Sequence, residues 1–164
     1  MSKVRRSETN VYGFGVFAAE DIPAGTVIAE FDGGFADADN ALSLPISRQG
    51  FDGRHAVQCA ERVWRDGNVD GIARYIAHSC SPNCGIKGYF KIVTKRDIPV
   101  GEELTWDYAM TEDSELPDMK CLCRKINCRG KIKSFSGMTP TERAEFIHLN
   151  RGFISTWLVK KYSL

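Results

Sequence analysis

The sequence predicts a mainly β protein, built from several small sheets and ending in short helices, so that the class overall is α+β. Three observations support this prediction. Short β-rich runs bounded by turn residues recur through the chain before residue 107. The motif Asp-Ile-Pro-x-Gly occurs at two distant places, and a helix-capping pattern begins at Thr139.

The repeated motif lies at Asp21–Gly25 and again at Asp97–Gly101. In each copy proline presets φ at the second turn position and glycine closes the turn, so each copy predicts a strand–turn–strand hairpin. Two distant hairpins are too few for a solenoid and indicate a fold assembled from small sheets. The β-rich runs before and after the two turns are Val16–Ala18, Thr26–Phe31, Tyr89–Thr94 and Glu103–Trp106.

The segments between these hairpins are less regular. Residues His55–Trp64 form a further strand candidate, which ends at the turn Arg65–Asn68. The run Gly33–Gly53 is rich in Ala, Asp, Ser and Gly and predicts a variable connection. Residues Thr111–Asp118 are acidic and irregular, and we interpret them as a mobile link.

The C-terminal tail carries the helical signals. Thr139-Pro-Thr-Glu142 is a capping box with proline at the first helical position, and it predicts a helix to about Leu149 that Gly152 can end. Apolar residues near helical spacing then predict a second short helix, and we expect both helices to pack on the β-rich body. These apolar residues are Phe153, Ile154, Trp157, Leu158 and Tyr162.

Length, charge and the distribution of apolar residues limit the kinds of partner that the chain is expected to bind. The chain has 164 residues, which suits one domain of ordinary size, and a net charge of +1 gives no overall field to attract nucleic acid or an anionic membrane. The N-terminus has no apolar signal core, and no apolar run approaches the roughly 20 residues that span a bilayer. We expect a soluble intracellular protein of the cytoplasm or nucleus, with no membrane partner. Export to a host cell by a signal-free route and the choice between monomer and dimer stay open.

Three cysteines gather near the C-terminal end. Cys121, Cys123 and Cys128 lie within eight residues, beside several Lys and Arg that would stabilise a negatively charged zinc–thiolate site. A structural zinc needs four ligands, and the residues alone leave the fourth open. The candidates are Cys59, Cys80, Cys84 and His78. The alternatives are three free thiols in a basic loop, or contact with nucleic acid, which the acidic residues just upstream disfavour.

Three motifs precede this cysteine knuckle in a fixed order: Gly13-Phe-Gly15, then Arg-Tyr-Ile-Ala-His-Ser-Cys-Ser-Pro-Asn-Cys at Arg74–Cys84, then Gly-Glu-Glu-Leu-Thr-Trp-Asp-Tyr at Gly101–Tyr108. Each alone is a weak signal. Together they resemble a SET-domain protein-lysine methyltransferase with a post-SET zinc knuckle, over Tyr12 to about Lys131. The resemblance implies a β-clip SET fold with a pseudoknot-like C-terminal threading. It divides the chain into a SET core (1–110, with a variable insert at about 33–53), a post-SET knuckle (111–133) and a helical tail (134–164) packed on the body.

The same resemblance implies the site residues. It makes S-adenosylmethionine the methyl donor, S-adenosylhomocysteine the product, and Cys80 the fourth ligand of a structural zinc beside Cys121, Cys123 and Cys128. It assigns catalysis to Tyr108, with Trp106 tuning the number of methyls and His78 bracing the pocket, and it places His55 in the acceptor channel. The implied donor-binding residues are Gly13, Phe14, Gly15, Arg74, Tyr75, Ala77, His78, Tyr108 and Leu122.

Each assignment has a plainer alternative. Gly13-Phe-Gly15 also suits a hairpin turn, His78 a core histidine, and Trp106 and Tyr108 two aromatic residues on opposite faces of one strand. The family usually has asparagine where this chain has Ala77, and the Gly-Asn pair before Ala73-Arg74 is missing. These departures favour a second reading, a catalytically inactive SET-like binding module, and a third is a zinc-knuckle nucleic-acid protein.

The implied substrate is a lysine in an extended, basic protein segment, such as a histone tail, that adds as a strand to a sheet edge. The acidic stretch Glu112–Asp118 is expected to attract it. Trp106 is a bulky ring without a hydroxyl, so we expect more than one methyl to be transferred.

Overall fold

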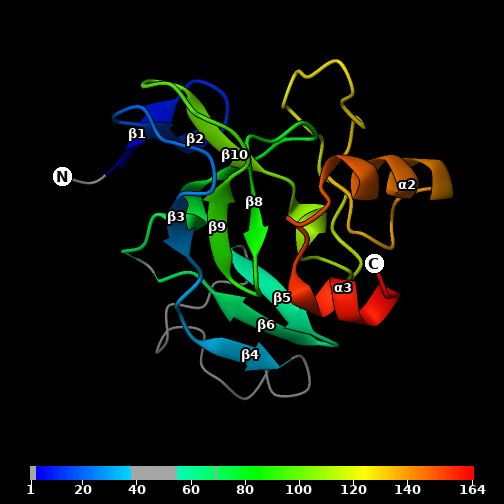
Figure 1. Cartoon of the computed structure of the whole chain (residues 1–164). Coiled ribbons are helices and arrows are strands. Elements are labelled where there is room, and N and C mark those ends of the chain that lie inside the picture. Colours follow the sequence, from blue (N-terminus) through cyan, green and yellow to red (C-terminus); the bar gives the residue numbers. More distant parts are fainter. Residues whose placement is uncertain (1–2, 38–54, 69) are drawn as a thin grey trace.

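The computed structural model describes residues 3–37, 55–68 and 70–164 (Figure 1). Within these ranges it contains ten strands in three small sheets, two short 3-10 turns and two C-terminal helices. The predicted class is therefore confirmed. The expected variable connection at 33–53 contains one short strand at its start, and its remainder from residue 38 lies outside the described residues.

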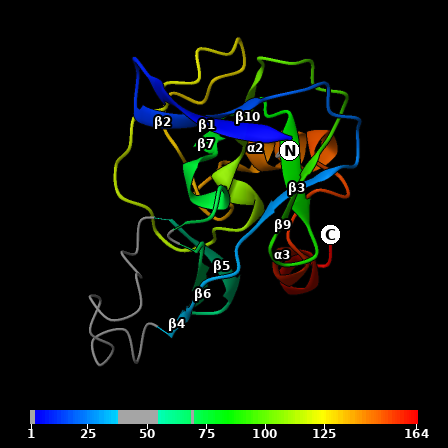
Figure 2. The same ribbon diagram turned by 90° about the vertical axis from the view of Figure 1, so that its left-hand side faces the viewer.

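The first sheet has the order β1-β2-β10-β7. Strands β1 (Val4–Thr9) and β2 (Gly13–Ala18) form an antiparallel hairpin, and β2 pairs antiparallel with β10 (Glu103–Trp106). The last strand, β7 (Ala77–His78), runs parallel to β10. Figure 2 shows β1 and β2 crossing one end of the molecule.

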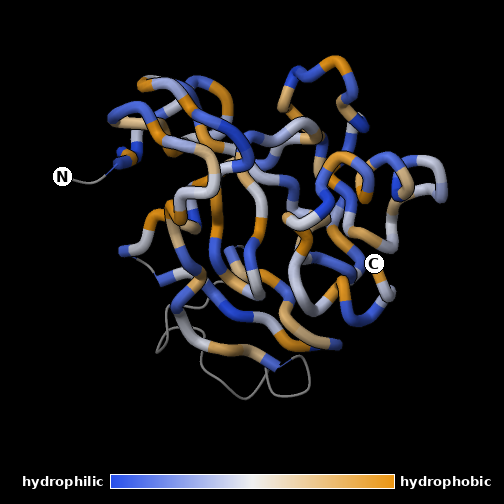
Figure 3. Tube along the Cα trace, in the orientation of Figure 1, coloured by the Kyte–Doolittle hydropathy of each residue, from blue (hydrophilic) through white to orange (hydrophobic). Residues whose placement is uncertain are grey.

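The other two sheets have three strands each, in the orders β3-β9-β8 and β4-β6-β5. All their pairings are antiparallel. Apolar segments run along the strands that face the interior (Figure 3). The strands of these sheets are β3 (Val27–Glu30), β9 (Lys91–Thr94), β8 (Cys84–Lys87), β4 (Phe35–Asp37), β6 (Val63–Asp66) and β5 (Ala56–Ala60).

The prediction that each repeated motif forms a hairpin is wrong, because the strands on either side of each turn do not pair with each other. Each turn sends its two strands into different sheets, so that β2 pairs with β10 and β3 with β9. Ile22 and Ile98 exchange both backbone hydrogen bonds at 2.8 Å. The side chain of Asp21 accepts from the backbone N–H of Val100, and Asp97 accepts from that of Ala24, each at 2.8 Å. Each turn therefore takes part of its hydrogen bonds from the other turn.

The single strand expected at His55–Trp64 is also wrong, because the segment folds back on itself. It forms the hairpin of β5 and β6, with a tight turn at Glu61 and Arg62. Arg62 has a φ of 58°, in the left-handed region that glycine or asparagine usually occupies. Since neither residue stands there, the sequence carries no recognisable turn signal.

Both predicted helices are present, but the second begins at Thr156, so that Phe153 and Ile154 precede it rather than lie within it. Helix α2 (Pro140–Leu149) begins at the Thr139 capping box, with both reciprocal hydrogen bonds present. It ends at Asn150, whose side chain donates to the Phe146 carbonyl at 2.9 Å, while Gly152 follows with a positive φ. Helix α3 (Thr156–Tyr162) buries its apolar face in the same core as the strands. Neither described helix combines the length and apolar character that crossing a membrane requires.

The acidic segment after β10 is irregular, as expected, but two of its carboxylates are held by the protein rather than free. Glu112 is 7% exposed. Asp113 accepts from the Tyr162 hydroxyl at 3.0 Å and pairs with Lys161 at 2.8 Å. The interpretation of this segment as a mobile link is therefore wrong for its first residues.

Candidate active site and metal centre

The first sheet places the three sequence motifs side by side. Strand β10 lies between β2, which carries the Gly-x-Gly motif, and β7, which belongs to the Arg74–Cys84 motif. Thr105 and Trp106 pair with Ala77 and His78, and the backbone N–H of Ser79 donates to the Trp106 carbonyl at 3.0 Å. Motifs far apart in the sequence therefore meet at the end of β10.

Tyr108 lies two residues beyond the end of this strand and begins the 3-10 turn Tyr108–Met110. Asp107 caps the turn, its carboxylate accepting from the Ala109 N–H at 3.1 Å. The Tyr108 backbone N–H donates to His78 Nδ1 at 3.3 Å, and the two rings lie 5.1 Å apart. Burial, aided by the charge of Arg129, lowers the pKa of His78 to about 3, so the imidazole is neutral and Nδ1 can accept. His78 thus positions the backbone of Tyr108.

A buried ion pair supports the same turn. One guanidinium nitrogen of Arg129 donates to both carboxylate oxygens of Asp107, at 2.9 and 2.7 Å. The Asp107 side chain is fully buried and that of Arg129 is 10% exposed. Burial raises the pKa of Asp107, and the Arg129 charge opposes the rise. Because Arg129 follows Cys128, this pair ties the cysteine knuckle to the residue next to Tyr108.

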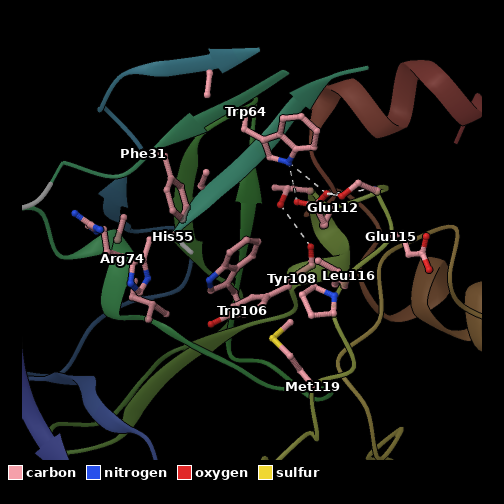
Figure 4. Close-up of a pocket in the computed structure, with 17 residues that line it drawn as sticks. Phe31, His55, Trp64, Arg74, Trp106, Tyr108, Glu112, Glu115, Leu116 and Met119 are labelled. Atoms are coloured by element: carbon pink, nitrogen blue, oxygen red, sulfur yellow. Dashed lines mark hydrogen bonds between the residues drawn. The ribbon is translucent and has the colours of Figure 1, made fainter. Parts of the chain in front are cut away.

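A cavity of about 710 Å³ opens in front of Tyr108 (Figure 4). The rings of Phe31, Trp64, Trp106 and Tyr108 line it, and Trp106 and Tyr108 lie 5.0 Å apart. Burial raises the pKa of Tyr108 to about 12, so its phenol is neutral at physiological pH. Of the residues predicted for the acceptor and donor sites, His55 and Arg74 also line this cavity.

A second, smaller cleft of about 280 Å³ lies between the first motif, the second motif and the knuckle. Tyr12, His78 and Leu122 meet in it, so the structure brings together three of the regions predicted for the donor. Next to the first motif, Phe14 contacts Tyr75 edge to face at 6.1 Å. The cleft is lined by a few apolar side chains, by the buried polar residues His78, Ser79 and Asn83, and by five charged residues.

The two glycines of the first motif differ in their surroundings. Gly13 has a φ of +85° with nothing within 4 Å of an added Cβ, so its backbone is open to an approaching group. A Cβ at Gly15 would meet the Glu103 carboxylate at 2.5 Å. Glu103 in turn accepts a hydrogen bond from the Tyr12 hydroxyl. The small size of Gly15 therefore accommodates Glu103.

The four cysteines predicted as zinc ligands converge. The sulfurs of Cys80, Cys121, Cys123 and Cys128 all lie within 4.8 Å of one another, and those of Cys80 and Cys121 are 3.7 Å apart. Four sulfurs placed tetrahedrally at about 2.3 Å from zinc are about 3.8 Å from each other. The residues therefore fit a structural zinc. Of the other candidates, Cys59 lies on β5 and Cys84 is buried on β8, away from this cluster. His78 lies beside it, with Nε2 3.5 Å from Cys80 Sγ, but the group that converges consists of the four cysteines.

Sequence reasoning missed several contacts that shape the site. Asn83 accepts from the Thr105 N–H at 2.8 Å and donates to the Glu103 carbonyl at 2.7 Å, so it clamps β10. The Ser-Pro-Asn-Cys run that contains it was the available signal. The Asp107–Arg129 pair and the contact of Trp64 with Glu112 had no local signal, because their partners are distant in the chain.

Comparison with known proteins agrees with this architecture. The chain is 35% identical to a histone-lysine N-methyltransferase, H3 lysine-4 specific, of Schizosaccharomyces pombe, over 76% of this chain and 14% of the relative. It is 31% identical to Histone-lysine N-methyltransferase trr of Drosophila melanogaster (78% and 6%), and 30% identical to human SETD1B (79% and 7%). The chain thus spans a small fraction of these relatives.

A solved structure shares the fold. The crystal structure of KRYPTONITE in complex with mCHG DNA and SAH superposes with a TM-score of 0.63 at 22% identity, covering 79% of this chain and 29% of that one. The family model described as the SET domain matches residues 13–109. From the order of its motifs, their meeting at β10 and this match, the chain belongs to the SET domain family.

Proposed function

We propose that the chain is an S-adenosylmethionine-dependent protein-lysine N-methyltransferase. The observation that carries the proposal is the position of Tyr108, at the end of the strand where the three motifs meet and on the wall of an aromatic cavity. The names of the relatives, histone-lysine N-methyltransferases, support the same reaction class.

The acceptor amine must be neutral before it can attack. A lysine with a pKa of about 10.4 needs roughly 4.6 kcal/mol to lose its proton at pH 7. The rings of Phe31, Trp106 and Tyr108 disfavour the charged ammonium by excluding water. Because the pKa of Tyr108 is raised, its phenol stays protonated and orients the amine by hydrogen bonding rather than acting as a base.

The donor would bind in the smaller cleft. S-adenosylmethionine supplies a methyl group on a positively charged sulfur, whose charge also disfavours an ammonium beside it. We propose that His78 and Leu122, which line the cleft, hold this ligand together with the open backbone at Gly13 and the main chain of Phe14 and Ala77. Arg74, Tyr75 and Tyr108 would complete the boundary between donor and acceptor. Since the adenine contacts use main-chain groups, Ala77 in place of asparagine is compatible with binding.

The zinc would be structural. Its four thiolates join the knuckle to the His78-Ser-Cys80 segment and close one side of the donor cleft. The ion would add no step to the reaction.

The substrate class follows from the cavity and the relatives. We propose a lysine in an extended segment of a protein, histone tails included, and a site of action in the cytoplasm or nucleus. Of the acidic residues expected to attract such a segment, Glu115 is exposed, whereas Asp118 pairs with Lys131 and Asp113 with Lys161, each at 2.8 Å. Trp106, 4% exposed beside Tyr108, leads us to propose transfer of more than one methyl.

One observation favours a second candidate, a SET-like module that binds protein without catalysis. Ala77 removes a polar side chain at the donor site. Calorimetric titration with S-adenosylmethionine separates the two: saturable binding supports the enzyme, and absence of binding supports the module.

The decisive experiment is mass spectrometry of a panel of histones and lysine peptides incubated with the protein and isotopically labelled donor. We expect a mass increase of one or more labelled methyl groups on lysine, lost in Tyr108→Phe. A full panel without labelled lysine would overturn the proposed function.

A further inference from the structure

Glu112 is a buried carboxylate on the wall of the larger cavity. It is 7% exposed, and it lines the cavity together with Trp64 and Tyr108. The Trp64 indole N–H donates to Glu112 Oε2 at 3.2 Å, and Ser114 donates to Oε1 through its backbone N–H at 3.2 Å and through its hydroxyl. Figure 4 shows the carboxylate between the Trp64 ring and the loop after Tyr108.

All of these donors are neutral. Among the residues that the structure describes, no lysine or arginine forms an ion pair with Glu112. Buried carboxylates are costly unless a cation pairs with them, and burial accordingly raises the pKa of Glu112. A carboxylate offers about four acceptor positions, and among the described residues Oε2 accepts only from Trp64. Glu112 can therefore accept a further, charged donor from the cavity.

The surrounding backbone fixes this carboxylate in place. The Glu112 backbone N–H donates to the Tyr108 carbonyl at 3.0 Å, which sets Glu112 one turn beyond the tyrosine. The Gln58 side chain accepts from the backbone N–H groups of Asp113 and Ser114, at 2.8 and 3.1 Å. Hydrogen bonds thus fix the loop that carries Glu112 at the cavity wall.

The charge of Glu112 does not suit the acceptor amine itself. A carboxylate beside that amine would stabilise its ammonium form, which cannot attack the donor. At about 710 Å³ the cavity lies in the range that holds whole small ligands, so it has room for more than one side chain. A planar indole next to a carboxylate is an arrangement that binds guanidinium, by stacking and by charge-assisted hydrogen bonds.

We propose that Glu112 and Trp64 form a subsite for an arginine of the substrate protein, two residues from the acceptor lysine. The proposal rests on the proposed lysine methylation. In an extended segment, side chains two residues apart point to the same side, about 7 Å from each other. When the lysine reaches Tyr108, such an arginine reaches the neighbouring wall where Glu112 lies. The enzyme then selects substrates that carry a cation near the acceptor lysine. An aromatic channel without Glu112 would not make this selection.

The test compares two peptides that differ in one charge. Both carry an acceptor lysine in a basic segment, one with arginine two residues away and one with citrulline, its uncharged isostere, at that position. We expect the wild type to lose on the order of tenfold in kcat/KM with citrulline, the size of one charge-assisted hydrogen bond. Glu112→Gln keeps an acceptor for Trp64 and Ser114 but removes the charge. It should act slowly on the arginine peptide and show no further loss with citrulline.

The control is Glu145→Gln, which removes an equivalent charge from the exposed face of α2 and should keep the wild-type preference. Equal rates of the wild type on both peptides, or a full arginine preference in Glu112→Gln, would overturn the subsite. The wild-type comparison needs no variant and stands even where Glu112→Gln fails to fold.

Direct peptide binding, followed by fluorescence anisotropy, separates the subsite from the reaction. A tighter wild-type complex with the arginine peptide, without any methyl transfer, refutes the proposed function and supports the subsite. Transfer that ignores the arginine charge, with equal affinities for both peptides, refutes the subsite and supports the function.

Discussion

Arg129→Met removes the cation of the buried pair and leaves the carboxylate of Asp107 without a charged partner. Methionine keeps the length and apolar character of the side-chain stem, so the main change is electrostatic. The backbone N–H of Arg129, which donates to Cys80 Sγ at 3.5 Å, is unaffected. We therefore expect the metal site to form and the turn at Tyr108 to be weakened.

The magnitude follows from the burial of the pair. Both side chains are almost removed from water, and breaking such a pair by deleting one partner costs about 3–5 kcal/mol. For a chain of this length that corresponds to a Tm lower by roughly 6–20 °C. Without Arg129 the largest interaction that opposes burial is lost, so the pKa of Asp107 rises further. The folded variant then binds a proton more tightly than the folded wild type, so its stability deficit grows as pH rises from the Asp107 pKa of the wild type to the higher one of the variant.

The assay is urea unfolding at several pH values, for wild type, Arg129→Met and the double variant Asp107→Asn/Arg129→Met. Asparagine still caps the Ala109 N–H but carries no charge, so the double variant should be more stable than the single one. If the free energy of unfolding of Arg129→Met lies within about 1 kcal/mol of the wild-type value at pH 7, the reasoning is refuted, because that difference is well below the cost of an unpaired buried charge. A stability deficit of Arg129→Met that does not change with pH would also refute it. A double variant no more stable than Arg129→Met would do the same.

Three further predictions test the site. Tyr108→Phe should lower kcat on the order of 100-fold, as expected for removing one aligned hydrogen bond at the reacting atoms, while calorimetry still detects donor binding; near-full activity would remove Tyr108 from its role. Chelation, or Cys123→Ser, should release zinc measurable by elemental analysis, lower the Tm and weaken donor binding, because the knuckle borders the donor cleft; an unchanged Tm would count against the zinc. Because burial raises the pKa of Glu112 in the folded state, its contribution to stability is full at low pH and is lost as pH rises from its ordinary carboxyl value to the raised one. Glu112→Gln should flatten that part of the pH profile of urea unfolding, and an unaltered slope would contradict the assignment.

Local signals predicted much of the fold from the sequence. The Thr139 capping box located the start of α2, because its two hydrogen bonds form between residues three apart. The knuckle cysteines and the Asp107-Tyr108 pair were recognised from short motifs. Their meeting in space followed from the resemblance, since spacing alone left the fourth zinc ligand open among several residues.

The contacts that the sequence did not predict are those between segments distant in the chain. Nothing near Asp21 indicates that its carboxylate accepts from Val100 rather than within its own turn. Trp64 and Glu112 are likewise 48 positions apart, and each alone suits a surface or a core. The hairpin of β5 and β6 was missed for a different reason, since its left-handed position holds Arg62 rather than glycine.

The pairing of the two turns through Ile22 and Ile98, called the clasp below, has a consequence for how the chain folds. Neither turn has a complete set of hydrogen bonds until residues more than 70 positions away have arrived. Closure of so long a loop costs entropy before any contact repays it, so the clasp forms late and slows folding. During synthesis the N-terminal turn must wait, incomplete, until its counterpart has left the ribosome.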